Sequence, residues 1–275
     1  MTKAKQRPTI PVLENPTNTV RVSQQDELDV WVTGEGSPVV LSHGANWPDL
    51  LVPLRDELVE RGYQAIYYHR RGYSGRPSTP FDYSANAVDI VKILDALGIE
   101  KAHVIGHSYA TDLVLDLGAE FPERVRSVVA MEGLAGAPEE VLQAAYARGP
   151  ELVARYQGGD GNGAVTDLLA GLGIVADDLV EQLTAEGVAN FFEVDVPTGA
   201  TLQVDLAKLG QNGSSVAAML SSEAGPLFVE ASAGITAAAP QTRQIVMPDS
   251  DHMFPIRKPA ETAAVLDEWF RSLDA

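Results

Sequence analysis

The pentapeptide GHSYA, residues 106–110, decides the fold expected for this chain. An apolar segment typical of a strand, residues 102–105, precedes it, and a segment with helical spacing, residues 112–121, follows it. A serine between small residues at a strand-to-helix turn is typical of a nucleophile whose hydroxyl the tight turn exposes, with the next backbone N–H directed at a developing oxyanion. Ser108 is therefore the candidate nucleophile, although a serine that caps a helix would occupy the same position.

The bulk composition limits the class of protein. With 275 residues, 45% of them hydrophobic, the chain can form one large α/β domain or two small ones. The absence of cysteine excludes disulfides, cysteine-ligated zinc and a thiol nucleophile. A net charge of −18 argues against nucleic acid and anionic membranes as partners, so we expect a small-molecule substrate.

The amino-terminal residues, 1–19, predict a loose arm ahead of the first strand. They contain no apolar segment typical of a secretory signal. No stretch of the chain approaches the roughly 20 apolar residues that span a bilayer. We therefore expect a cytoplasmic protein.

Strand and helix patterns alternate along most of the chain, which predicts a mostly parallel, twisted, eight-stranded sheet with helices on both faces. The first two strands are expected to form a hairpin, and Asp49 is available to cap the first helix. The expected strands cover residues 20–22, 28–32, 39–41, 64–68, 102–105, 125–131, 226–231 and 243–247, and the expected helices cover residues 50–58, 83–97, 112–121 and 259–273.

Four motifs occur in an order that resembles the α/β-hydrolase fold family, over residues 20–273. They are His43-Gly44, Arg71-Gly72, the pentapeptide at 106–110 and Asp251-His252. The resemblance implies an α/β-hydrolase fold and a Ser-His-acid triad. Arg71 is expected to have a structural role, buried in hydrogen bonds.

The alternation is interrupted between residues 136 and 222, where the pattern is mostly helical. An insertion after the sixth strand is where this fold usually carries a helical cap over the serine. The sequence therefore predicts an arm at 1–19, a core domain at 20–135 and 223–275, and a cap at 136–222.

His252 is the candidate general base. It lies just after the last strand, where the catalytic histidine follows in the serine-first order of this fold. The other four histidines fall in tight turns or in and beside strands. A histidine in a surface loop is the competing interpretation.

Glu132, at the end of the sixth strand, is the candidate acid. The segment after the expected strand at 226–231 offers no carboxylate in its turn, whereas Glu132 ends the strand beside that of the serine. A carboxylate there can orient the imidazole and stabilise its charged form. Asp249, Asp251 and Glu230 are the competing acids.

The oxyanion hole is expected from the backbone N–H groups of Tyr109 and Ala45, one directly after the nucleophile and one after the third strand. Asn46, Trp47 and Phe254 are the expected pocket residues, although Trp47 could equally serve in packing. No metal ligand and no cofactor are expected.

The combination of Ser108 with Glu132 resembles the arrangement in zearalenone-type lactonases. Haloalkane dehalogenases place the acid similarly but have an aspartate nucleophile, which argues against carbon–halogen cleavage here. The expected function is cofactor-free hydrolysis of an ester or lactone, in a protein that could be a homodimer. The alternatives are non-ester chemistry at the same site (carbon–carbon hydrolysis, a lyase or a cofactor-independent oxygenase) and a ligand-binding receptor.

Overall fold

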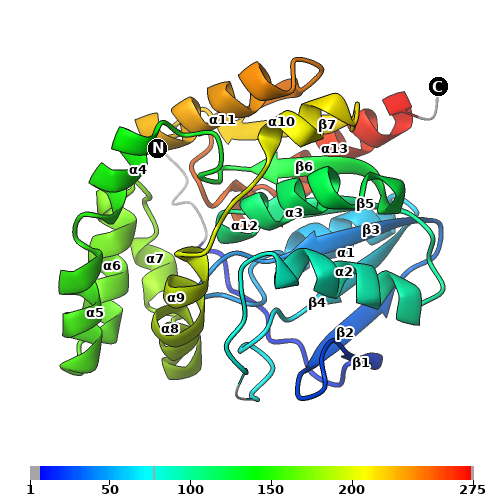
Figure 1. The fold of residues 1–275 in the computed structure, drawn as a ribbon. Helices are drawn as coiled ribbons and strands as arrows, with labels where there is room; N and C mark the ends of the chain where they lie inside the picture. The colour runs from blue at the N-terminus through cyan, green and yellow to red at the C-terminus, as the bar shows by residue number, and fades with distance from the viewer. Residues whose placement is uncertain (1–6, 77, 274–275) are drawn as a thin grey trace, which may run out of the picture.

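The computed structural model describes residues 7–76 and 78–273, so the first six residues of the expected arm lie outside it. Its centre is an eight-stranded sheet with the strand order β1-β2-β4-β3-β5-β6-β7-β8 (Figure 1). Strands β1 and β2 form the expected hairpin, β2 pairs antiparallel with β4, and the remaining pairs are parallel. The strands are β1 Asn18–Arg21, β2 Glu27–Thr33, β3 Ser37–Ser42, β4 Tyr63–Tyr68, β5 Ala102–His107, β6 Val125–Met131, β7 Val216–Ser221 and β8 Arg243–Met247.

The central strands β5 and β6 are almost entirely buried, as the apolar character of their residues predicts for a parallel sheet covered on both faces. His107 at the end of β5 lies opposite Met131 at the end of β6. Because both strands end at the same level, the next residues, Ser108 and Glu132, leave the sheet side by side.

Helices cover both faces of the sheet. Apolar side chains of α1 and α13 pack on one face, and those of α2, α3 and α10 pack on the other. No helix in the described part of the chain is both long and apolar enough to cross a membrane. The core helices are α1 Val52–Glu60, α2 Ala85–Ala96, α3 Tyr109–Glu120, α10 Leu206–Gln211, α11 Pro226–Ala238, α12 Phe254–Arg257 and α13 Pro259–Leu273.

The strand expected over residues 226–231 is wrong, because these residues begin helix α11. Leu227, Ala231 and Ile235 are buried at helical spacing, and proline starts the helix, where its missing N–H costs nothing. The seventh strand is instead β7, Val216–Ser221, which pairs with both β6 and β8. The expected cap boundary at 222 is therefore also wrong, since β7 belongs to the sheet.

Residues 139–199 form a helical insertion between strand β6 and helix α10, where the chain returns to the core. Figure 1 shows it as a separate layer beside the sheet. Its last part is one continuous helix in which Phe191–Asp195 form a π-helical turn. The helices are α4 Glu139–Tyr146, α5 Gly149–Gln157, α6 Gly161–Gly171, α7 Asp177–Val180, α8 Ala185–Asn190 and α9 Val196–Gly199.

A buried ion pair joins the insertion to the core. Nη1 and Nη2 of Arg70 bind the two carboxylate oxygens of Asp195 at 2.8 and 3.0 Å, and each residue is about 1% exposed. The Tyr73 hydroxyl donates to the same carboxylate at 2.6 Å, and the Tyr109 hydroxyl donates to the carbonyl of Asp195 at 3.1 Å. The π-helical turn is thus bound directly to the segments that follow β4 and β5.

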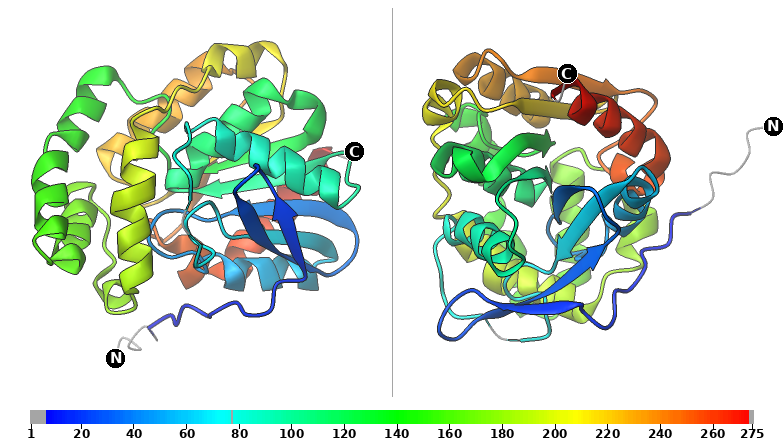
Figure 2. Two further views of the ribbon diagram at one scale, coloured as in Figure 1. Left: turned by 60° about the horizontal axis from the view of Figure 1, so that its bottom comes forward. Right: turned by 90° about the vertical axis from the view of Figure 1, so that its right-hand side faces the viewer.

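The described part of the arm, residues 7–17, is not loose. It runs along the edge of the molecule (Figure 2), and the N–H of Ile10 donates to Gln182 of the insertion at 2.9 Å. The N–H of Leu13 donates to Asp49 at 3.1 Å. The arm therefore connects the core to the insertion, and Asp49 binds the arm instead of capping α1.

Replacement of Asp195 by alanine is expected to lower the free energy of unfolding by about 3–5 kcal/mol, because it leaves the Arg70 charge buried without its partner. Urea denaturation measures the change. Glu181→Ala is the matched control, since the pair of Glu181 with Arg7 is exposed at 66% and 67% and its loss should cost less than about 1 kcal/mol. If the two variants lost equal amounts of unfolding free energy, the buried pair of Asp195 with Arg70 would not stabilise the protein more than an exposed pair does.

Candidate active site

Ser108 occupies a strained turn between β5 and α3. Its φ of 54° and ψ of −122° lie in a region that side chains rarely adopt, and such strain gathers at functional sites. A Cβ on Gly106 would lie 2.2 Å from the carbonyl oxygen of Ala110, so only glycine fits there. The N–H of Ser108 donates to the Met131 carbonyl at 2.9 Å, which fastens the turn to β6.

Glu132 and His252 are hydrogen-bonded although 120 residues separate them. His252 Nδ1 lies 2.6 Å from Oε2 of Glu132, and the N–H of Ser221 donates to Oε1 at 2.5 Å. Glu132 is 2% exposed and also has a positive φ of 52°. Burial would raise the pKa of this carboxyl, but the hydrogen bond and charge of His252, with the donation from Ser221, outweigh it and hold the pKa below its usual value.

None of the competing carboxylates contacts His252 in the described part of the chain. Asp251 accepts the N–H of Met253, and Asp249 and Glu230 are exposed. The correct position of β7 adds a further candidate, Glu223, which lies in the turn directly after that strand and ahead of the segment that the sequence analysis considered. Its side chain is exposed.

Aromatic and imidazole rings fix the position of His252. Its ring stacks on Phe228, with centroids 4.9 Å apart. His107 Nε2 donates to the carbonyl of His252 at 2.9 Å. Burial, followed by the nearby His252, lowers the pKa of His107 to about 3, so His107 stays neutral and acts as a fixed donor.

Arg70 orients the loop after β3, a role that the sequence analysis missed. Its Nε donates to the carbonyl of His43, and its Nη2 donates to that of Gly44, both at 3.0 Å. In a trans peptide the C=O and the following N–H point in opposite directions. The N–H of Ala45 is therefore directed away from Arg70, and both Gly44 and Ala45 line the cavity over Ser108.

In the sequence, the feature that could have indicated this role is the pair of adjacent arginines, Arg70 and Arg71, after β4. We assigned a structural role to Arg71, and the structure agrees, because Arg71 binds Asp89 through two nitrogens and Asp26 through the third. Asp195, the partner of Arg70, lies 125 residues further along the chain, in the segment 191–196 that also contains Glu193. Nothing local links the two.

A cavity of about 640 Å³ lies over Ser108 and His252. Asn46 and Trp47 line it as expected, but Phe254 does not. The Phe254 ring is fully buried and meets His107 edge-on, because it begins α12 beneath the histidine loop. The insertion supplies an apolar wall, formed by Leu152, Val153, Leu168, Leu169, Leu172, Phe191 and Phe192.

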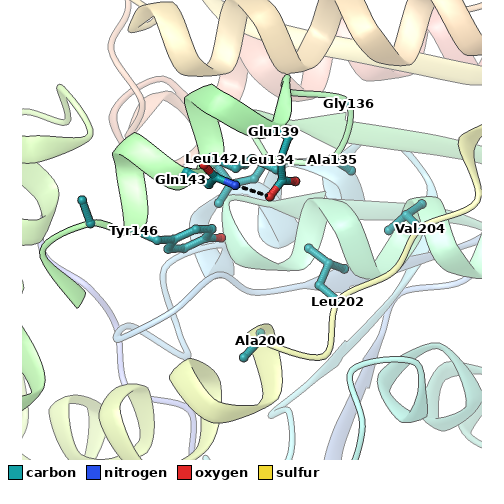
Figure 3. Close-up of a pocket in the computed structure, with 12 residues that line it drawn as sticks. Leu134, Ala135, Gly136, Glu139, Leu142, Gln143, Tyr146, Ala200, Leu202 and Val204 are labelled. Carbon is teal, nitrogen blue, oxygen red and sulfur yellow. Dashed lines mark hydrogen bonds between the residues drawn. The ribbon is translucent and has the colours of Figure 1, made fainter. Parts of the chain in front are cut away.

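A second hollow of about 550 Å³ adjoins the cavity between α4 and the segment after α9 (Figure 3). Leu134, Tyr146, Ala200 and Leu202 line both spaces. Figure 3 shows the Tyr146 ring extending from α4 at this shared boundary. The cavity thus continues toward the surface past α4, a helix that buries none of its residues.

Asp112 is a buried carboxylate in the wall of the cavity that sequence reasoning did not single out. It is 3% exposed, and its Oδ1 accepts the N–H groups of Leu134 and Ala135 at 3.1 and 2.9 Å. Burial raises its pKa to about 6 in spite of these two hydrogen bonds. Among residues 7–76 and 78–273, no group of three His, Cys, Asp or Glu side chains is arranged to hold a metal ion.

The charge of Asp112 is expected to destabilise the folded protein at high pH. The pKa of Asp112 rises from 3.8 in the unfolded chain to about 6 in the folded protein, so folding takes up a proton between pH 3.8 and about pH 6. The destabilisation by the charge is therefore complete above about pH 6. Asp112→Asn should raise the free energy of unfolding at pH 8 by up to about 3 kcal/mol, at roughly 1.4 kcal/mol per pKa unit, with almost no gain at pH 4. Urea denaturation at both pH values measures this, and a gain independent of pH would contradict it.

Comparisons with known proteins support the α/β-hydrolase fold. The family model described as "alpha/beta hydrolase fold" matches residues 37–170. The provisionally named carbamate hydrolase RutD of Azorhizobium caulinodans is 33% identical over 135 residues, 46% of this chain and 51% of that protein. The rhodomycin D methylesterase DauP of Streptomyces sp. strain C5 is 30% identical over 128 residues, 41% of this chain and 42% of that protein. The chain thus spans about half or less of these relatives.

Solved structures match over nearly the whole chain. A crystal structure from work on carboxylesterases of the ammonia-oxidizing thaumarchaeon Nitrososphaera gargenis has a TM-score of 0.75 at 19% identity, covering 96% of this chain and 99% of that one. An alpha/beta hydrolase from Sphaerobacter thermophilus has a TM-score of 0.74 at 24% identity, covering 92% and 100%. At such identities these matches speak for the fold alone, in agreement with the strand order of the sheet.

Proposed function

We propose that this protein, which has the α/β-hydrolase fold, is a cofactor-free serine hydrolase that cleaves a carboxylic ester or lactone through an acyl-enzyme. The observation that carries the proposal is the 2.6 Å hydrogen bond between His252 and the buried carboxylate of Glu132, at a cavity that Ser108 also lines. Nucleophile, base and acid would then come from three neighbouring places on one edge of the sheet.

The proposed reaction proceeds in two halves. Ser108 Oγ attacks the carbonyl carbon while His252 Nε2 accepts its proton, and that proton then passes to the departing alcohol oxygen. A water molecule next gives a proton to His252 and attacks the acyl-enzyme, and Ser108 leaves with that proton. Glu132 holds the Nδ1–H of His252 and stabilises the imidazolium formed in each half.

The N–H groups of Ala45 and Tyr109 are the proposed oxyanion donors. Both residues line the cavity, and Arg70 directs the Ala45 group toward it through the Gly44 carbonyl. The next amide along the loop, that of Asn46, already donates to the hydroxyl of Tyr73 at 3.1 Å, which leaves Ala45 as the donor from this loop.

We propose that the helical insertion, residues 139–199, acts as the cap of the active site. Its leucine and phenylalanine side chains line the same cavity as Ser108. A largely apolar wall favours substrates with an apolar acyl or alcohol part, which gains from leaving water. The resemblance to zearalenone-type lactonases makes a lactone one of the ester substrates to test.

Ser108→Ala is expected to abolish hydrolysis of short 4-nitrophenyl esters, because no other serine, threonine or cysteine is among the described residues that line the cavity. Absorbance assays measure the rate. Ser84→Ala is the control, since Ser84 is exposed and its side chain makes no cap hydrogen bond at α2. Equal rates in Ser108→Ala and the parent would overturn the assignment, and covalent phosphonate labelling of Ser108 without turnover of esters or lactones would favour non-ester chemistry.

Glu132→Gln is expected to slow ester hydrolysis by up to about 10⁴-fold, because an amide can neither fix the imidazole tautomer nor stabilise its charge. The matched control is Glu223→Gln, which removes the charge from the turn after β7. A steady-state comparison of kcat/KM distinguishes the two positions. A slow Glu223→Gln variant beside an unaffected Glu132→Gln variant would transfer the acid role to Glu223.

A further inference from the structure

We infer that Asp112 forms a subsite for a positively charged group of the substrate, one helical turn from Ser108. The ligand chemistry is an alkylammonium group carried close to the scissile ester. The subsite defines a substrate class for the proposed serine hydrolase. Its use in catalysis rests on that proposed function, whereas the binding of a cation does not.

The position of Asp112 brings it to the reacting centre. It lies in the first turn of α3, the helix that begins directly after Ser108. Both residues line the same cavity, so a substrate bound there can reach the two together.

Asp112 has a free acceptor and no counter-ion. Only Oδ1 accepts hydrogen bonds from the described residues, and Asp112 takes part in no ion pair there. The other two carboxylates of the cavity wall are paired, Glu132 with His252 and Asp195 with Arg70. No lysine or arginine is among the described residues that line the cavity. An anionic substrate would find no partner here, whereas a cation would.

Three tyrosines that line the cavity are sensitive to the charge of Asp112. Burial first, and then the charge of Asp112, raises the pKa of Tyr83, and the same charge contributes to the raised pKa values of Tyr109 and Tyr146. All three line the cavity, and the rings of Tyr83 and Tyr109 lie 5.2 Å apart. The Arg70 guanidinium already lies over the Tyr109 ring, 4.6 Å from its centroid, so Tyr83 and Tyr146 are the rings expected to attract an alkylammonium group, which they do without neutralising the carboxylate.

The structural role of Asp112 does not require a charge. Its Oδ1 holds the N–H groups of Leu134 and Ala135, and the carbonyl oxygen of an asparagine could accept both. A buried carboxylate without a counter-ion is unfavourable in the folded protein. The negative charge therefore points to a ligand that compensates it.

The experiment compares a cation with a neutral molecule of the same shape. Dissociation constants are measured at pH 8 by calorimetry for butyrylcholine and 3,3-dimethylbutyl butyrate, with Ser108→Ala protein, so that binding is read without turnover. A second pair, ethyl 4-(trimethylammonio)butanoate and ethyl 5,5-dimethylhexanoate, carries the charge on the acyl side. We expect at least tenfold tighter binding of the cation in one pair.

Asp112→Asn in the Ser108→Ala background should reduce this preference to about twofold or less. Asp116→Asn is the matched control, because Asp116 lies one turn further along α3, is also buried, and has a pKa that burial raises to about 6, but does not line the cavity. It should keep the preference. Thermal denaturation shows whether each variant is folded.

Two results would overturn the subsite. One is the absence of cation preference in both pairs, and the other is an equal preference in the Asp112→Asn and Asp116→Asn proteins. The proposed hydrolase fails on a different result, when the parent enzyme with Ser108 intact turns over neither member of either pair nor 4-nitrophenyl esters. Cation binding without turnover would leave the subsite standing and remove the hydrolase.

Discussion

The rest of the site depends on the hydrogen bonds and the ion pair that the planar guanidinium of Arg70 forms. Two of its nitrogens bind Asp195 of the insertion, and the same group holds the carbonyls of His43 and Gly44. One rigid side chain therefore fixes both the position of the insertion on the core and the direction of the amide in the loop after β3. A lysine could not do this, because an ammonium group lacks the fixed fork of donors.

The backbone of the site is held as firmly as its side chains. Asn46, Ser108 and Glu132 follow three different strands, and each has a positive φ without being glycine. Such conformations persist only where the surroundings enforce them, and here the parallel register of β3, β5 and β6 does so. The residues proposed to react are thus positioned by the ends of the sheet strands.

The sequence was most informative where one local pattern was sufficient. A pattern of fewer than ten residues predicts each of the apolar strands β3, β5 and β6. The same is true of the tight turn at Ser108, which its small neighbours indicate. Strand β7 was missed because alanine, present at 217 and 218, is uncommon in strands, and pairing between two strands overrides such propensity. The partnership of Arg70 with Asp195, and the cavity position of Asp112, depend on contacts over long sequence distances that no local pattern contains.

The π-helical turn at Phe191–Asp195 has a consequence for how the insertion can vary. Such a turn holds one residue more than the α-helical turn it replaces, and each residue rotates a helix by about 100°. Loss of a single residue from this turn would rotate Asp195 out of reach of Arg70. The docking of the whole insertion on the core therefore depends on the number of residues in this one turn.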